Sequence, residues 1–271
     1  MTRDHAVSAD LRTSLCIPST TLNRLYTQCE DVVSTDFRLS HESGNPTFWR
    51  CCGPTRHPGS HISVFEAATG YTVAVKFELN PTVKKQIEAG EPFDLVIINP
   101  HMVHDLTALR KIKRGSQVAF GRIAMGVAAK AGSRPLDIRS VEAFEHALKN
   151  ARSIAYAVDG TSGGYFSGLL ERLGIADEVK PRLVGIRGGK TALAVARGKA
   201  ELAVVPVSSI LAAAPDVMLV GRFPAELQSY IDFAIGISAD SRDTEAAKQL
   251  SAFLMSAEVD GTLAAKGVER R

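Results

Sequence analysis

Two kinds of hydrophobic pattern alternate along most of this chain. After residue 60, short runs rich in Val and Ile, such as 71–78 and 94–98, predict strands. Between them, apolar residues three and four apart predict amphipathic helices that end at Gly or Pro. Regular alternation of strands and helices is typical of parallel sheets covered by helices on both faces. Residues 62–271 therefore read as one coherent α/β unit.

The remaining elements follow from the same patterns and from capping residues. Ser60 and Ser140 are expected to cap helices, and Asn80 is expected to cap a helix whose first residue is Pro81. The run 94–98 is apolar throughout, which favours a buried parallel strand. Further strands are expected at 118–129, 153–158, 182–186, 201–205, 217–220 and 230–237. Further helices are expected at 162–173, 191–197, 208–214, 244–254 and 257–266.

Residues 1–59 lack this regularity and are treated as an unassigned N-terminal segment. All four cysteines and the single tryptophan of the chain lie there. A helix is expected at 20–33 and a short strand at 36–39, and the rest reads as loop. Because the cysteine spacings match no zinc pattern, free thiols are expected.

Composition excludes several classes of protein. With 45% hydrophobic and 23% charged residues among 271, the chain is expected to be globular. A net charge of +3 without a basic, aromatic-rich stretch argues against nucleic-acid binding. No apolar run is long enough to span a membrane. The first thirty residues lack a signal peptide, so the sequence as written predicts a cytoplasmic protein.

The loop 159–165 is the strongest candidate for a binding site. It lies between a predicted strand and a predicted helix and contains Thr161, Ser162 and Gly163. Small residues let the backbone approach a ligand, hydroxyls donate hydrogen bonds, and a helix N-terminus carries a partial positive charge. The loop is therefore a candidate anion site, although an ordinary loop with a capping hydroxyl has the same composition.

Further ligand-binding candidates follow two other predicted strands. Asn80 and Thr82 enter one helix, and Asn99 ends the strand at 94–98. Gly189 lies in the glycine-rich loop 185–191, which resembles a phosphate-binding P-loop but is one residue short of that pattern. Nucleotide binding is therefore not expected.

Candidates for catalysis are few. His101 and His104 have a spacing that would allow metal binding on a helix, but no third ligand accompanies them and the segment reads as a solvated loop. Ser167 lacks the flanking glycines of a nucleophile elbow. The sequence therefore predicts no catalytic residue, metal or cofactor, and favours binding without chemistry.

Residues 62–271 resemble the type II periplasmic solute-binding proteins, in particular their molybdate-binding branch. The stretches that carry the resemblance, in order, are Phe65-Glu-Ala-Ala-Thr-Gly, Gln86-Ile-Glu-Ala-Gly, Phe93-Asp-Leu-Val, residues 161–173, Arg197-Gly-Lys-Ala-Glu-Leu and Phe223-Pro-Ala-Glu-Leu. The resemblance implies two α/β lobes joined by strands that cross near Gly121 and Gly221. Lobe I would then comprise residues 60–120 and 222–271, and lobe II residues 121–221.

The resemblance also implies a function. Such proteins hold a small anion between their lobes with neutral donors and deliver it to the membrane permease of an ABC importer. A periplasmic monomer that binds a molybdate-like or tungstate-like oxyanion, or an organic anion, is therefore expected. Effector domains of LysR-type regulators and some transferases share the fold, so a cytoplasmic ligand sensor and an enzyme stay open as alternatives.

The chain departs from the family pattern in three places. Family members begin with a strand and a Ser-Ala-Gly-Ala-like ligand loop, and residues 1–61 resemble neither. Asn80-Pro-Thr stands where the family has a Ser/Thr-Ser-Gly run, and Pro206 stands where molybdate binders have a tyrosine. The first strand and its ligand loop are therefore expected to be missing or replaced. A mis-assigned or frame-shifted start that yields a non-binding product is one hypothesis for this change.

Overall fold

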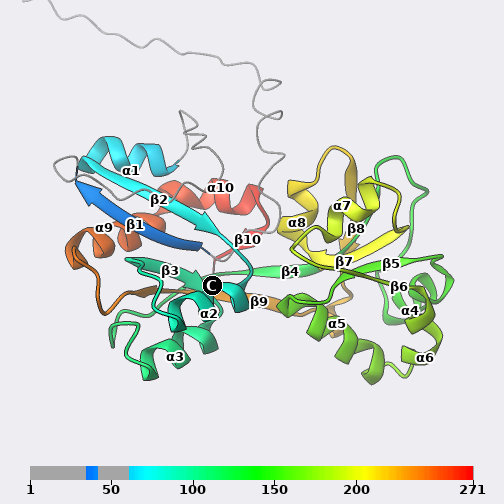
Figure 1. Ribbon diagram of the computed structural model, residues 1–271. Helices are drawn as coiled ribbons and strands as arrows, with labels where there is room; N and C mark the ends of the chain where they lie inside the picture. Colours follow the sequence, from blue (N-terminus) through cyan, green and yellow to red (C-terminus); the bar gives the residue numbers. More distant parts are fainter. Residues whose placement is uncertain (1–34, 42–60, 271) are drawn as a thin grey trace, which may run out of the picture.

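One continuous sheet runs through both halves of the molecule (Figure 1). The computed structural model describes residues 35–41 and 61–270, and the strands of these residues follow the order β2-β1-β3-β9-β4-β7-β5-β6, with β8 and β10 also paired to β4. The strands are β1 (Thr35–His41), β2 (Tyr71–Phe77), β3 (Leu95–Ile98), β4 (Val118–Lys130), β5 (Ile154–Ala157), β6 (Leu183–Ile186), β7 (Leu202–Pro206), β8 (Val217–Arg222), β9 (Tyr230–Ile237) and β10 (Val268–Glu269).

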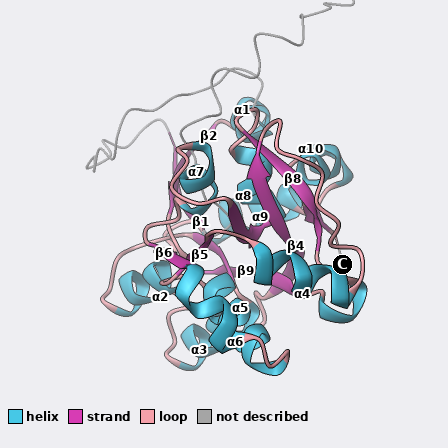
Figure 2. Ribbon diagram, turned by 90° about the vertical axis from the view of Figure 1, so that its right-hand side faces the viewer, coloured by secondary structure: helices cyan, strands magenta, loops and turns pink. Residues whose placement is uncertain are grey.

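Helices cover both faces of this sheet (Figure 2). The helices are α1 (His61–Thr69), α2 (Asn80–Glu88), α3 (Pro100–Ala108), α4 (Val141–Asn150), α5 (Thr161–Arg172), α6 (Ala176–Val179), α7 (Thr191–Ala196), α8 (Val207–Ala212), α9 (Thr244–Leu254) and α10 (Asp260–Ala265). Short 3-10 turns occur at Lys180–Arg182, Ala225–Leu227 and Ala257–Val259. Among the described residues, every helix is too short or too polar to cross a lipid bilayer.

The long strand β4 connects the two halves. Its first part, residues 118–124, pairs with β9 in one half, and its second part, residues 125–130, pairs with β7 and β8 in the other. The chain is thus a two-lobe α/β protein, as predicted. The lobe boundaries expected at residues 121 and 221 stay a prediction.

Strand directions differ between the halves. β5 is parallel to both β6 and β7, which confirms the predicted parallel sheet there. The prediction that 94–98 forms a parallel strand is wrong, because β3 is antiparallel to both of its neighbours, β1 and β9. Its apolar residues are nevertheless all buried, because helices cover both faces.

The strand β1 occupies the central position between β2 and β3. It is antiparallel to both, pairs with β2 along its whole length and meets β3 through Thr35–Phe37. The short strand predicted at 36–39 is confirmed, and the first strand of the sheet is replaced rather than missing. Because β1 is antiparallel to β2, its last residue, His41, lies beside Tyr71 at the start of β2. This end of β1 is far from where β2 and β3 end.

Helix starts were only partly predicted. Ser140 caps α4 by accepting a hydrogen bond from the backbone N–H of Ala143, as expected. Asn80 does not cap α2, because it is already the first helical residue and Leu79 holds the cap position without a side-chain bond. The prediction of a loop around His101 and His104 is wrong, because both residues lie in helix α3. The predicted cap at Ser60 and helix at 20–33 lie outside the described residues.

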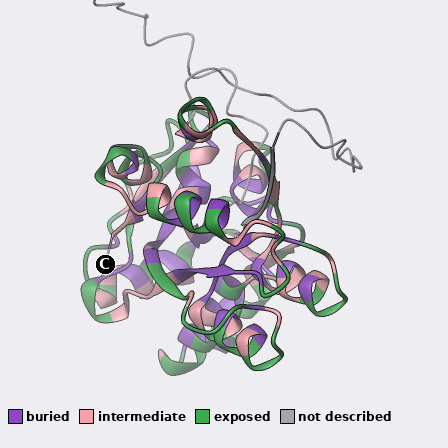
Figure 3. Ribbon diagram, turned by 90° about the vertical axis from the view of Figure 1, so that its left-hand side faces the viewer, coloured by how far each residue is buried: buried purple, intermediate pink, exposed green. Residues whose placement is uncertain are grey.

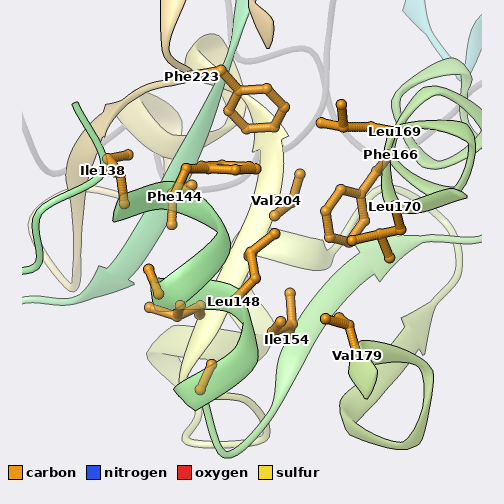
Figure 4. Packing of buried hydrophobic residues seen from close by; sticks show 14 of the residues in the cluster. Ile138, Phe144, Leu148, Ile154, Phe166, Leu169, Leu170, Val179, Val204 and Phe223 are labelled. Carbon is orange, nitrogen blue, oxygen red and sulfur yellow. The ribbon is translucent and has the colours of Figure 1, made fainter. Parts of the chain in front are cut away.

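Separate apolar clusters fill the two halves. Alternate residues of β7 serve both faces of the sheet: Leu202 and Val204 pack against α4 and α5, and Ala203 and Val205 against α7 and α8. Figure 4 shows the first of these clusters, in which the Phe144 and Phe223 rings lie 4.8 Å apart. Figure 3 shows the resulting pattern of burial, in which the strands are mostly buried and the outer faces of the helices around them are exposed.

Candidate functional site

Three helices begin directly after strands that end toward the middle of the molecule. β2 leads into α2, β3 into α3 and β5 into α5. β2 and β3 point the same way, because each is antiparallel to β1. Figure 1 shows α2 and α5 on either side of the middle. Free backbone N–H groups at such helix starts carry a partial positive charge and favour anions.

A hydrogen bond between two predicted site residues joins the halves at this point. The Thr161 hydroxyl, at the start of α5, donates to Oδ1 of Asn99, at the start of α3, over 3.2 Å. Asn99 is only 3% exposed. Its Nδ2 donates to the backbone carbonyl of Asp232 on β9 at 2.8 Å, which fixes the amide so that Oδ1 faces Thr161. The contribution of Asp232 is made by its backbone, so no sequence signal could have found it.

Ser162 and Gly163 complete the first turn of α5. Ser162 is 6% exposed, and its hydroxyl has no hydrogen-bond partner among the described residues. Gly163 packs so closely on the end of β5 that a Cβ atom there would lie 1.5 Å from the carbonyl oxygen of Ala157. Glycine is thus required for packing at this position, and its contact with a ligand stays a prediction.

Asn80 and Thr82 lie at the same edge of the sheet as Asn99. Asn80 is buried, Thr82 is half-buried, and the Thr82 backbone N–H donates to the carbonyl of Leu79 at 2.8 Å. β1 separates the strands that lead to these two groups. The structure therefore joins Asn99 and Thr161 directly and leaves the role of the α2 residues as a prediction.

Gly189 belongs to a loop that is tied to the Thr161 loop. Gly188 and Gly189 both have positive φ angles, 65° and 72°. The Gly188 backbone N–H donates to Oδ2 of Asp159 at 3.0 Å. Asp159 was not among the predicted site residues, although it lies in the loop that the sequence singled out. Because the Gly188 N–H is paired with this carboxylate, it is not one of a set of free N–H groups such as a P-loop presents to a nucleotide.

No candidate metal site accompanies these residues. Within residues 35–41 and 61–270, no three His, Cys, Asp or Glu side chains gather in a way that could hold an ion. His101 and His104 are exposed on α3. The arrangement offers hydroxyl, amide and backbone N–H donors, which suit an uncomplexed anion.

The fold and these helix starts define a two-lobe protein that binds a small solute. The chain belongs to the family of bacterial extracellular solute-binding proteins, whose family model matches residues 60–269. The resemblance to type II solute-binding proteins is thereby confirmed.

Individual relatives share most of the chain. An aconitate isomerase from Pseudomonas sp is 28% identical over 211 residues, which cover 76% of this chain and 78% of that protein. The molybdate-binding protein ModA of Escherichia coli is 27% identical over 201 residues, covering 72% and 78%. The solved structure of the Azotobacter vinelandii periplasmic molybdate-binding protein matches with a TM-score of 0.66 at 20% identity, over 78% of this chain and 92% of that one.

Proposed function

We propose that this protein binds a small oxyanion, molybdate-like or tungstate-like, or an organic anion between its halves. The observation that carries the proposal is the Thr161–Asn99 hydrogen bond, which brings the starts of α5 and α3 together. Thr161, Ser162 and Asn99 are the central ligand-binding residues, with Asn80, Thr82, Gly163 and Gly189 around them. An anion that accepts a hydrogen bond from the Thr161 hydroxyl would replace Asn99 Oδ1 as its acceptor.

The electrostatics of the site favour an anion. Helix starts and neutral donors attract negative charge without the cost of burying a lysine. Two cations, Arg187 and Lys190, are exposed in the loop before α7. They add a positive field beside the site without occupying it.

The relatives support the same ligand class. Two are named for molybdate and one for aconitate, a tricarboxylate, so the shared property is negative charge. We further propose that the protein serves the permease of an ABC importer, acts in the periplasm as a monomer and binds no nucleic acid. Size-exclusion chromatography and cell fractionation test the monomer and the location.

The first experiment is a thermal melt with molybdate, tungstate, sulfate, phosphate and aconitate, each in excess. A ligand at a hundred times its Kd should add about 2.7 kcal/mol to the free energy of unfolding. A rise in Tm with one or more of these anions is expected. A cooperative melt that none of them changes would contradict the proposal.

Catalysis is the second candidate function, and the relative named aconitate isomerase favours it. We propose binding without chemistry, because the family model that matches the chain describes solute-binding proteins. Incubating the protein with either aconitate isomer and following the product by proton NMR separates the two functions. Conversion that scales with protein concentration would establish the isomerase.

A further inference from the structure

Two loops in one half of the molecule hold buried polar atoms that have no hydrogen-bond partner in the described part of the chain. They follow β5 and β6, which are parallel neighbours, so both loops leave the sheet at the same edge. The Asp159 carboxylate joins them through Oδ2 and the Gly188 N–H, at 3.0 Å. Asp159 lies two residues before Thr161, and Gly188 lies next to Gly189. The link therefore belongs to the proposed anion site.

The second carboxylate oxygen of Asp159 is buried and has no hydrogen-bond partner among the described residues. The same holds for the hydroxyl of Thr191, a residue that is 1% exposed and follows the Gly188–Gly189 loop. Buried polar atoms are almost always paired, because an unpaired one loses its hydrogen bonds to water without replacement. Asp159 belongs to the link between the two loops and Thr191 follows Gly188 by three residues, so one bound molecule could supply a partner for both atoms.

The chemistry of the two atoms says what that partner must offer. An ionised carboxylate only accepts hydrogen bonds, whereas a threonine hydroxyl both donates and accepts. A fully deprotonated anion such as molybdate or sulfate brings only acceptors, so it would place lone pairs and negative charge against Asp159. An anion that carries an O–H group would donate to Asp159 Oδ1 instead.

We propose that Asp159 determines specificity at this site by selecting anions that carry an O–H group, such as hydrogen phosphate or a hydroxy acid. This inference rests on the proposed anion-binding function and narrows its ligand class. The O–H group donates to Asp159 Oδ1, and Thr191 donates to another oxygen of the same ligand. Thr161 and Ser162 donate to its charged oxygens.

Two pairs of matched ligands test the proposal by isothermal titration calorimetry. In mildly alkaline buffer, phosphate is mainly a dianion with one O–H group, and sulfate is a dianion of the same shape without one. Citrate and tricarballylate differ only in a hydroxyl group. The protein should bind the hydroxyl-bearing member of at least one pair about tenfold or more tightly than its partner.

The Asp159→Asn variant should reduce this ratio to near one or reverse it. Asparagine keeps the shape and can still accept from Gly188 through its oxygen, while its amide now donates to an acceptor-only anion. Asp216→Asn makes the same change of charge at an exposed position before β8 and should keep the ratio of the unmodified protein. A thermal melt of each variant checks its folding.

The outcomes separate the two proposals. Equal binding within both pairs, or molybdate binding more tightly than phosphate and citrate, overturns the selection by Asp159 but supports the anion-binding function. A ratio that survives in a folded Asp159→Asn variant also overturns it. If Asp159→Asn does not fold, an unchanged ratio in a folded Asp159→Ser variant, which lacks the carboxylate, overturns it as well. If the unmodified protein binds none of these anions, the proposed function fails and this inference fails with it.

Discussion

The Thr161 hydroxyl can donate one hydrogen bond, and Asn99 accepts it. A bound anion therefore competes with an internal hydrogen bond. The net contribution of Thr161 to the binding free energy is the difference between the free energies of these two hydrogen bonds. Ser162 has no such internal partner in the described part of the chain. Its hydroxyl should therefore bind a ligand without first losing an internal hydrogen bond.

Replacing Thr161 and Ser162 together by alanine removes both donors. We expect binding of the ligand to weaken by roughly 1–3 kcal/mol, the usual range for hydrogen bonds to a charged partner. Calorimetry with the anion identified by thermal melts measures the change. Ser167→Ala, at an exposed position of the same helix, serves as the control. Equal affinities for the double variant and the unmodified protein would refute the assignment.

Gly163 and Gly164 are adjacent in α5 but differ sharply in their surroundings. A Cβ atom at Gly163 would collide with the Ala157 carbonyl at 1.5 Å, whereas one at Gly164 would have nothing within 4 Å. Gly163→Ala should therefore destabilise the protein by about 1–3 kcal/mol or more. Gly164→Ala should be neutral or stabilising by up to about 1 kcal/mol, because alanine favours helices. Denaturant unfolding compares the two, and equal effects would contradict the packing described for Gly163.

At the scale of elements, the sequence predicted best the helices and loops whose signals lie within one short segment. Helix α5 and the loop before it were predicted, because small residues, hydroxyls and an apolar face lie within one short segment. Helix α3 was missed, because its start at Asn99-Pro100 looked like the end of a strand. The direction of β1 was also beyond prediction, because pairing between distant strands leaves no local signal. For the same reason Asn99 was predicted as a ligand-binding residue, but its contact with Thr161 was not predicted.

The cap of α4 gives a prediction at this scale. Ser140 accepts from the Ala143 N–H at 3.2 Å, and α4 in turn carries Phe144 into the core. Ser140→Ala should lower the free energy of unfolding by about 1 kcal/mol. Ser140→Asp keeps a capping oxygen at a helix start and should restore most of the loss. Urea denaturation of both variants tests this, and an alanine variant as stable as the unmodified protein would contradict the role of the cap.

At the scale of the whole molecule, Asn99 links the two halves. Asn99→Ala removes both the bond to Thr161 and the bond to the Asp232 carbonyl. We expect the ligand-free variant to be more open, with a larger radius of gyration in small-angle X-ray scattering. Asn150→Ala, an exposed asparagine at the end of α4, should leave the radius unchanged. Identical scattering from all three proteins would show that this link does not restrain the halves.

The reversed strand β1 has a consequence for how this sheet can be assembled. The family match begins at residue 60, yet β2 and β3 meet only through a strand from residues 35–41. A fragment that starts at residue 60 would expose two facing rows of unpaired backbone groups, which are templates for aggregation. Such a gap accepts a strand in either direction, so a separate peptide added to the fragment could restore the sheet by complementation in trans.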